Sequence, residues 1–364
     1  MSQSTGKSLP APQSPPPLTG YIPTLDGWRA VAVAIVICAH VFSSLRDIGV
    51  FGVLIFFGIS GILITSRMLE EQGVRGEISL KGFYIRRGFR ILPPLFLLLI
   101  VLAIARLLGL ICLPWVDWFK SLLFVRNYGN FGTCWCTMHI WSLSVEEHFY
   151  LLWPTILVFA GRRHALKIAL FGAIAVALWR TARVHWSLLP WLGDFRYNTD
   201  TQLDILLAGA ATAMLLADDK LRSSAHRLLP PAMTIAVFIF FALLTADCAI
   251  VFDSRFHNAV RLIDPVLICM FLAGGILHPR QLLGRVLEWP PIRWVGRLSY
   301  SLYLWQQVFT SPSASNPFLQ RFPANIVAIV AIAAASYYIL ERPMMRLGHR
   351  LARPASPGRG DLRA

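Results

Sequence analysis

The stretch WRAVAVAIVICAH, residues 28–40, indicates the fold class of this chain. Between its ends nearly every residue is Ala, Val, Ile or Cys, as expected for a helix that faces hydrocarbon. Arg29 and His40 interrupt this apolar pattern. Their spacing puts the two side chains roughly 20° apart on one helix face and about 16 Å apart along its axis. The segment therefore predicts a membrane helix with a cation at one depth and an imidazole at another.

The whole chain has the composition of a membrane protein. Of its 364 residues, 56% are hydrophobic and only 15% are charged, and the mean hydropathy is +0.58. A soluble globular chain does not carry so much apolar surface. Apolar segments near the roughly 20 residues that a membrane helix needs lie at 25–44, 49–66, 92–112, 141–160, 165–180, 202–217, 229–251, 262–277, 298–311 and 323–340. We predict an all-α polytopic bundle of about ten transmembrane helices.

The net charge of +15 could suggest a nucleic-acid partner. In a membrane protein it is better explained by topology, because Lys and Arg accumulate in cytoplasmic loops. With the N-terminus inside, the predicted inner segments hold 23 Lys and Arg residues and the outer segments hold 9. We therefore expect both termini in the cytoplasm and no nucleic-acid partner. The sequence leaves the oligomeric state open.

The two ends of the chain differ from the middle. Residues 1–20 are rich in Pro and Ser and predict a disordered cytoplasmic tail. Residues 21–346 form the predicted membrane domain, and residues 347–364 form a short basic cytoplasmic tail. No metal site is expected, because the pair Cys134 and Cys136 has no second pair of ligands nearby.

A second polar group lies in WSLSVEEHFYLLWP, residues 141–154. Ionisable groups inside a membrane cost at least about 2.5 kcal/mol each at a helix centre, so they tend to mark function. Glu146 and Tyr150 are four residues apart and share a helix face, whereas Glu147 points about 100° away. The simpler interpretation is an anionic cap at a helix start. In the predicted topology, however, His40 and Glu146 fall in the same membrane layer, so they could meet.

A third group lies in FYIRRGFRILPP, residues 83–94, just before an apolar segment on the predicted inner side. Arg86, Arg87 and Arg90 could anchor the chain to anionic lipid. They could equally form a phosphate-binding patch, since the guanidinium fork matches phosphate oxygens.

In this order, these segments resemble the acyltransferase 3 family of integral membrane proteins. LDGWRAVAVAIVICAH is similar to its Arg-x10-His element, and WSLSVEEHFYL to Trp-Ser-Leu-x-Val-Glu-x-x-Phe-Tyr. Further similar segments are FFGISGILIT (56–65), RRGFRILP (86–93), LDILLAGAATA (203–213), LSYSLYLWQQ (298–307) and ERP (341–343). Gln306 replaces a frequent His of the late element, so we assign no catalytic proton transfer there. The likeness covers about residues 21–346.

The resemblance implies a bacterial inner-membrane O-acyltransferase. Its donor would be acetyl-CoA or another acyl-CoA, and its acceptor a hydroxyl of a glycan or glycolipid at the cell envelope. His40, whose ordinary pKa lies near neutrality, would act as the base, and Glu146 would orient it. Arg29, Arg86, Arg87 and Arg90 would bind the phosphates of CoA. The candidate supporting hydrogen-bond donors are Ser60, Tyr150, Tyr300 and Tyr303. A covalent acyl-histidine intermediate remains open.

A transporter is the alternative. A proton-coupled carrier or a flippase of lipid-linked glycan also holds an intramembrane His and Glu. Such proteins are typically built from inverted repeats with broken helices. The sequence has no visible repeat, which favours the enzyme.

Overall fold

The computed structural model describes residues 18–129, 134–251, 261–310 and 318–352. Within these ranges the chain folds into helices and loops, which confirms the all-α prediction. Most of the two predicted tails, at 1–20 and 347–364, lies outside the described residues.

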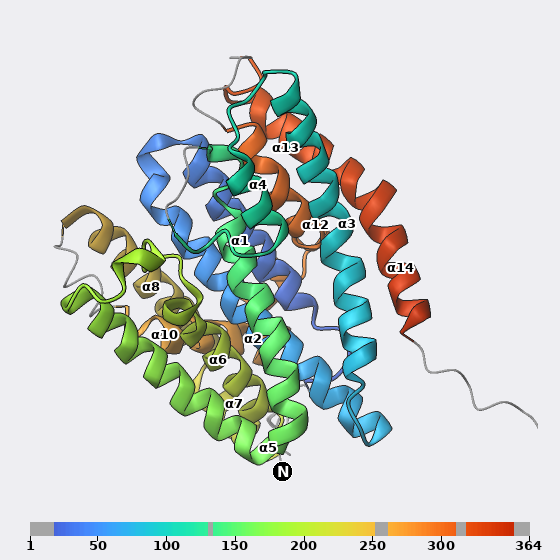
Figure 1. Cartoon of the computed structure of the whole chain (residues 1–364). Helices are drawn as coiled ribbons and strands as arrows, with labels where there is room; N and C mark the ends of the chain where they lie inside the picture. Colours follow the sequence, from blue (N-terminus) through green and yellow to red (C-terminus); the bar gives the residue numbers. More distant parts are fainter. Residues whose placement is uncertain (1–17, 130–133, 252–260, 311–317, 353–364) are drawn as a thin grey trace, which may run out of the picture.

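Figure 1 shows the arrangement of the helices. The main helices are α1 Pro23–Val41, α2 Gly49–Arg75, α3 Leu80–Leu107, α4 Trp115–Leu122, α5 Ile140–His185, α6 Thr199–Leu216, α7 Asp219–Leu228, α8 Pro231–Val251, α10 Asp264–Leu277, α11 Leu282–Leu287, α12 Pro290–Trp305, α13 Ala324–Ala335 and α14 Arg342–Leu351. Short 3-10 turns are η1 Ser43–Ile48, η2 Trp135–Thr137, η3 Pro190–Leu192 and η4 Gln306–Val308, and Ser336–Glu341 is π-helical.

Helix α2 lies at the centre of the bundle and is the most buried of the long apolar helices found in the described residues. It packs against α1 on one side and α6 on another. The approach to α6 needs small residues, because a Cβ atom on Gly61 would lie 2.2 Å from the carbonyl oxygen of Leu206. A Cβ atom on Gly209 would likewise lie 2.6 Å from the Gly58 oxygen. Close contact of this kind drives helix association in membranes, and here it sets the position of neighbouring Ser60.

Helix α5 is interrupted at Gly161, whose φ of 68° and ψ of 163° are not helical. Glycine adopts this left-handed φ without steric cost. Figure 1 shows two arms of α5 that meet at the bottom of the view, with the second arm running back upward beside α6. The two arms correspond to the predicted segments 141–160 and 165–180.

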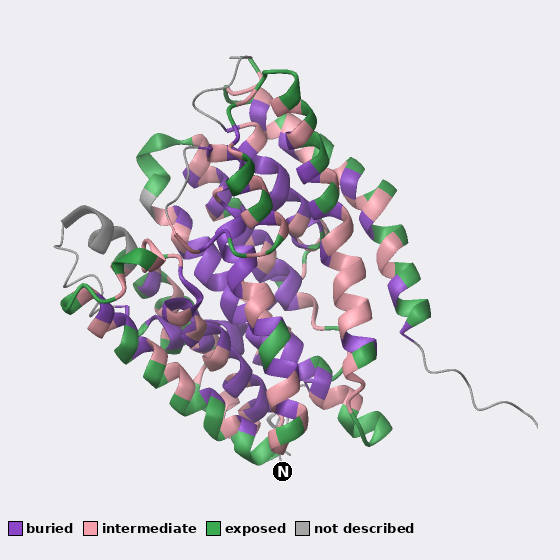
Figure 2. Cartoon of the chain, viewed as in Figure 1, coloured by how far each residue is buried: buried purple, intermediate pink, exposed green. Residues whose placement is uncertain are grey.

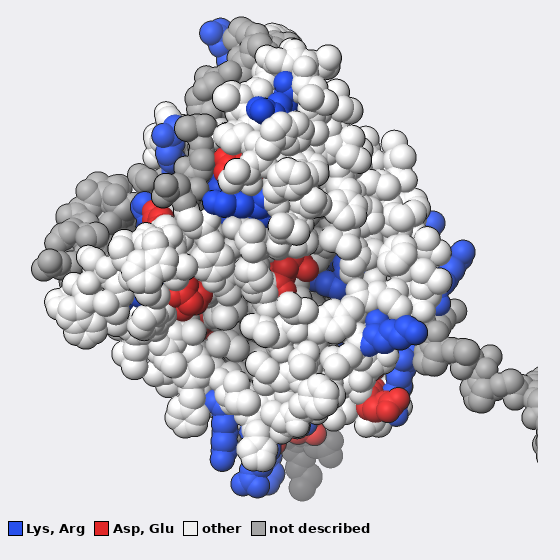
Figure 3. Space-filling model, in the orientation of Figure 1, with Lys and Arg blue, Asp and Glu red and all other residues white. Residues whose placement is uncertain are grey.

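The surface of the bundle is that of a membrane protein. Helix α3 exposes Phe96, Ile100, Ile104 and Leu107, which recur every three or four residues and form one outward stripe. In Figure 2 exposed positions cover the second arm of α5 and α14, while the central helices are buried. In Figure 3 most of the visible surface is uncharged, and the Lys, Arg, Asp and Glu side chains lie in small separate patches. Large exposed apolar surfaces of this kind suit contact with lipid.

The count of ten transmembrane helices is not confirmed. Among the described residues, five helices are long and apolar enough to cross a membrane, or six if the bent pair α6 and α7 is one span. Helix α13 continues through the π-helical turn into α14, and this stretch, Ala324–Leu351, is one of the five. Helices α10 and α12, in contrast, have only 14 and 16 residues. Their segments were predicted from apolar composition, but each helix is shorter than the roughly 20 residues of a full crossing.

Candidate active site

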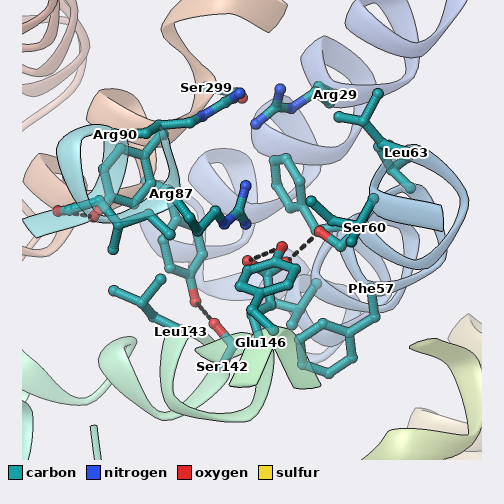
Figure 4. A pocket seen from close by; sticks show the side chains of 18 residues that line it. Arg29, Phe57, Ser60, Leu63, Arg87, Arg90, Ser142, Leu143, Glu146 and Ser299 are labelled. Carbon is teal, nitrogen blue, oxygen red and sulfur yellow. Dashed lines mark hydrogen bonds between the residues drawn. The ribbon is translucent and has the colours of Figure 1, made fainter. Parts of the chain in front are cut away.

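A cavity lies between α1, α2, α3, α5 and α12, and Figure 4 shows the side chains that line it. Eight of the ten predicted site residues are among them: Arg29, Ser60, Arg87, Arg90, Glu146, Tyr150, Tyr300 and Tyr303. They come from five helices that are far apart in the sequence. The cavity wall does not include His40 or Arg86.

Glu146 is the carboxylate of this cavity. Ser60 Oγ donates a hydrogen bond to Glu146 Oε1 at 2.8 Å, and the Tyr150 hydroxyl donates to Oε2 at 3.2 Å. Both carboxylate oxygens are thus held by hydroxyl groups, one from α2 and one from the next turn of α5. Glu147 does not line the cavity, in agreement with its predicted different face.

Three arginines lie beside this carboxylate. The guanidinium carbon of Arg87 lies 3.6 Å from the centre of the Tyr150 ring, in cation–π geometry. Figure 4 shows Arg29 and Arg90 reaching toward each other above Arg87. None of the three forms a salt bridge with a carboxylate in the described part of the chain. Such a cluster of cations attracts an anionic ligand.

The same arginines join the cavity to a groove on the surface, which we call the basic groove. Arg29, Arg87 and Arg90 line both spaces. The groove is also lined by Tyr21, Asp26, Arg67, Glu71, Arg75, Phe83, Arg86 and His349. Arg86 lies here and forms a salt bridge of 2.9 Å with Glu71, so its charge is compensated. A ligand in the groove would therefore reach the cavity past the three unpaired arginines.

The two tyrosines of α12 form hydrogen bonds with neighbouring helices at the cavity wall. The Tyr300 hydroxyl donates to the carbonyl oxygen of Ile91 at 2.9 Å. The Tyr303 hydroxyl donates to the carbonyl oxygen of His139 at 2.9 Å and lies 2.6 Å from Ser142 Oγ. These bonds tie α12 to α3 and to the start of α5.

His40 is not hydrogen-bonded to Glu146. Its Nδ1 is 2.7 Å from Gln306 Oε1, and its ring meets Trp135 edge-on with centroids 5.3 Å apart. Sequence reasoning expected Glu146 to orient this imidazole, whereas in the structure the hydrogen-bond partner is an amide. Gln306 thus contacts His40 directly, at the position where no proton transfer was assigned.

His139 is a candidate that sequence reasoning missed. It is 2% exposed, and Gln307 Oε1 accepts from its backbone N–H at 3.1 Å and lies 2.8 Å from its Nδ1. The available signal was an ionisable residue immediately before an apolar segment. Gln306 and Gln307, adjacent in sequence, therefore hold one imidazole each. We call His40, Trp135, His139, Gln306 and Gln307 the histidine cluster.

Residues 22–341 match the model of a protein family described as an acyltransferase domain. The chain belongs to this acyltransferase family. The match covers most of the chain and includes every residue of the cavity, the predicted arginines and the histidine cluster. The resemblance inferred from the sequence motifs is therefore confirmed.

Two curated relatives extend this assignment. The chain is 29% identical to the peptidoglycan O-acetyltransferase OatA of Listeria monocytogenes over 362 residues, covering 90% of this chain and 56% of that protein. It is 30% identical to a Bacillus subtilis protein named "Putative peptidoglycan O-acetyltransferase YrhL" over 359 residues, covering 91% of this chain and 56% of that protein. The chain thus spans just over half the length of these relatives. No solved structure matches it significantly.

Proposed function

We propose that this acyltransferase-family protein is a membrane O-acetyltransferase. It would move an acetyl group from acetyl-CoA, or a similar short acyl group from another acyl-CoA, to a hydroxyl of an envelope glycan. The observation that carries the proposal is the cavity in which Glu146 lies beside three unpaired arginines that continue into the basic groove. The names of the relatives support peptidoglycan as the acceptor.

The arginines would bind the donor. Acyl-CoA carries several phosphate charges on its nucleotide end and its reactive thioester at the other end. Arg29, Arg87 and Arg90 present guanidinium groups where the groove meets the cavity, and guanidinium forks match phosphate oxygens. With the phosphates held there, the thioester extends through the cavity, past Ser60 and Glu146, toward Ser142 at the end that Tyr303 joins to the histidine cluster.

His40 would activate the acceptor. The Gln306 amide oxygen is suited to accept a hydrogen bond from the Nδ1–H of His40, which leaves Nε2 with the lone pair that a base requires. The hydroxyl oxygen attacks the thioester carbonyl, its proton passes to the base, and the carbon–sulfur bond breaks. The thiolate then takes up a proton and leaves as free CoA. Proton transfer of this kind contributes about 10²–10⁴-fold to rate.

The same proposal assigns an orientation in the membrane. The basic groove would face the cytoplasm, where acyl-CoA is made, and the histidine cluster would lie toward the outside of the inner membrane. Reporter fusions inserted at Gly76, beside the groove, and at Gly109, beyond α3, should then report opposite sides. Reporters on the same side would overturn this orientation.

The decisive experiment uses the purified full chain with acetyl-CoA and a soluble chitopentaose acceptor. We expect release of free CoA and an acetylated oligosaccharide by mass spectrometry. A flippase or transporter would release no CoA, and that result would overturn the proposal. The family match favours the enzyme over the transporter.

A further inference from the structure

Three buried polar atoms of the histidine cluster have no hydrogen-bond partner within the described residues. They are Nε2 of His139, Nε1 of Trp135 and Nε2 of Gln306. Gln306 and His139 are 0% and 2% exposed, so neither side chain has ready access to bulk water. Leaving such an atom unpaired costs about 1–3 kcal/mol, and in native proteins most are satisfied by some group.

The three atoms belong to one connected set of side chains. Gln306 contacts His40, His40 packs against Trp135, and the next residue, Gln307, holds His139. Tyr303 and Ser142 join this set to the cavity, because Tyr303 donates to the His139 carbonyl and both residues line the cavity. Figure 4 shows Ser142 at the opposite end of the cavity from Arg29 and Arg90.

The protonation of His139 follows from its neighbours. A backbone N–H can only donate, so the Gln307 atom that it meets must be the amide oxygen. That same oxygen faces Nδ1 of His139 and can only accept, so Nδ1 carries the proton of the neutral ring. Nε2 of His139 is then a buried acceptor.

The three unpaired atoms are therefore one hydrogen-bond acceptor, on His139, and two hydrogen-bond donors, on Trp135 and Gln306. An anion would satisfy only the donors, and a cation would satisfy only the acceptor. A hydroxyl group does both, because it donates one hydrogen bond and accepts others. A molecule with several hydroxyls would satisfy the whole set.

We propose that Trp135, His139 and Gln306, beside His40, form the binding subsite for the polyhydroxylated glycan acceptor. An acceptor hydroxyl donates to Nε2 of His139, and the indole and amide N–H groups donate to other oxygens of the glycan. This inference rests on the proposed function and adds where the acceptor binds. His139 is a binding residue here, and Gln307 is the positioning residue that sets its tautomer.

The test compares two substitutions of His139. Asn places an amide where Nδ1 was and deletes Nε2, whereas Gln reaches the position of Nε2 and restores an acceptor there. With chitopentaose and saturating acetyl-CoA, His139→Asn should raise the acceptor KM about tenfold or more, and His139→Gln should return it to within about threefold of wild type. The KM for acetyl-CoA should not change in either variant.

Matched controls separate binding from folding. His148→Asn alters a histidine of α5, the helix that follows His139; its Nδ1 lies 2.6 Å from Thr199 Oγ1, and the change should leave the acceptor KM unchanged. Gln307→Glu keeps an acceptor oxygen and should preserve transfer, whereas Gln307→Leu should behave like His139→Asn. If His139→Asn does not accumulate in the membrane, Trp135→Phe provides the measurement, with an acceptor KM raised about fivefold.

The outcomes are distinct. An unchanged acceptor KM in His139→Asn, or an equal loss of donor affinity and acceptor affinity, would overturn the subsite and leave a structural or water-filled cluster. A wild-type protein that releases no CoA from acetyl-CoA would instead overturn the proposed function, and the subsite with it.

Discussion

Helix α1 joins two chemically opposite regions, since it carries Arg29 at one end and His40 at the other. The basic groove opens toward the surface, and among the described residues its arginines Arg29, Arg87 and Arg90 form no salt bridge, whereas Arg86 pairs with Glu71. In the histidine cluster no described residue forms a salt bridge with the imidazoles, and amide side chains hold them in place. The first region can attract any polyanion of suitable shape, because charge attraction tolerates imprecise geometry. The second depends on which nitrogen carries a proton, so it demands exact hydrogen-bond geometry.

The cavity around Glu146 lies between these regions and shares residues with one of them. Arg87 belongs to both the groove and the cavity wall, while Tyr303 connects the wall to the histidine cluster. The comparison therefore predicts separable defects. Changes in the groove should alter use of the donor, and changes in the cluster should alter transfer to the acceptor.

The largest effect is expected at His40. His40→Ala removes the base and should lower acetyl transfer by about 10²–10⁴-fold, while binding of acetyl-CoA, measured by calorimetry, stays within about threefold of wild type. His164→Ala is the matched control, because His164 is exposed and its Nδ1 hydrogen-bonds to the carbonyl oxygen of Ala160, also in α5. An active His40→Ala protein, or one that no longer binds acetyl-CoA, would contradict the assignment of donor binding to the basic groove and of acceptor activation to the histidine cluster.

A smaller but still severe effect is expected at Glu146. Glu146→Gln removes the charge that the Ser60 and Tyr150 hydroxyls hold, and it should reduce kcat about 10²-fold. Glu147→Gln, which changes a carboxylate outside the cavity wall, should reduce kcat less than threefold. Steady-state kinetics of the pair checks this, and equal damage at both positions would show that the acidic pair acts only as a helix cap.

Part of this fold could be predicted from the sequence alone. The helices could be predicted because each apolar run must find a buried or lipid-facing place, and even the break of α5 at Gly161 falls between two predicted segments. The number of transmembrane helices was less predictable. Composition marks an apolar helix such as α10, but it does not fix how many residues stay helical or how deep the helix lies.

The site could be predicted only in part, for a different reason. Helix periodicity places Glu146 and Tyr150 on one face, and the structure shows their hydrogen bond. The pairing of His40 with Gln306 joins residues that are 266 positions apart, and no periodic pattern encodes such a contact. His139 was missed because a single histidine in a loop carries no spacing signal, and its importance depends on burial and on Gln307.

At the basic groove we expect an intermediate effect on donor affinity. Arg87→Ala and Arg90→Ala should each raise the KM for acetyl-CoA about tenfold, because charge-assisted contacts contribute about 1.5–3 kcal/mol, with little change in kcat at saturating donor. The increase should vanish with an acetyl thioester that lacks the nucleotide. If the arginines only anchor the protein to lipid, both donors will be affected equally.

The smallest effect is expected at Arg86, although the sequence groups it with Arg87 and Arg90. Its side chain is 28% exposed and already paired with Glu71 at 2.9 Å, outside the cavity wall. Arg86→Ala should therefore raise the KM for acetyl-CoA less than threefold. Its main consequence should be the loss of a partly exposed ion pair, which contributes about 0.2–1 kcal/mol to stability. A double-mutant cycle with Glu71→Ala, followed by thermal unfolding in detergent, measures that coupling directly. A tenfold rise in donor KM at Arg86 would instead mean that the phosphates of CoA displace Glu71, and the donor site would then extend along the groove to the surface.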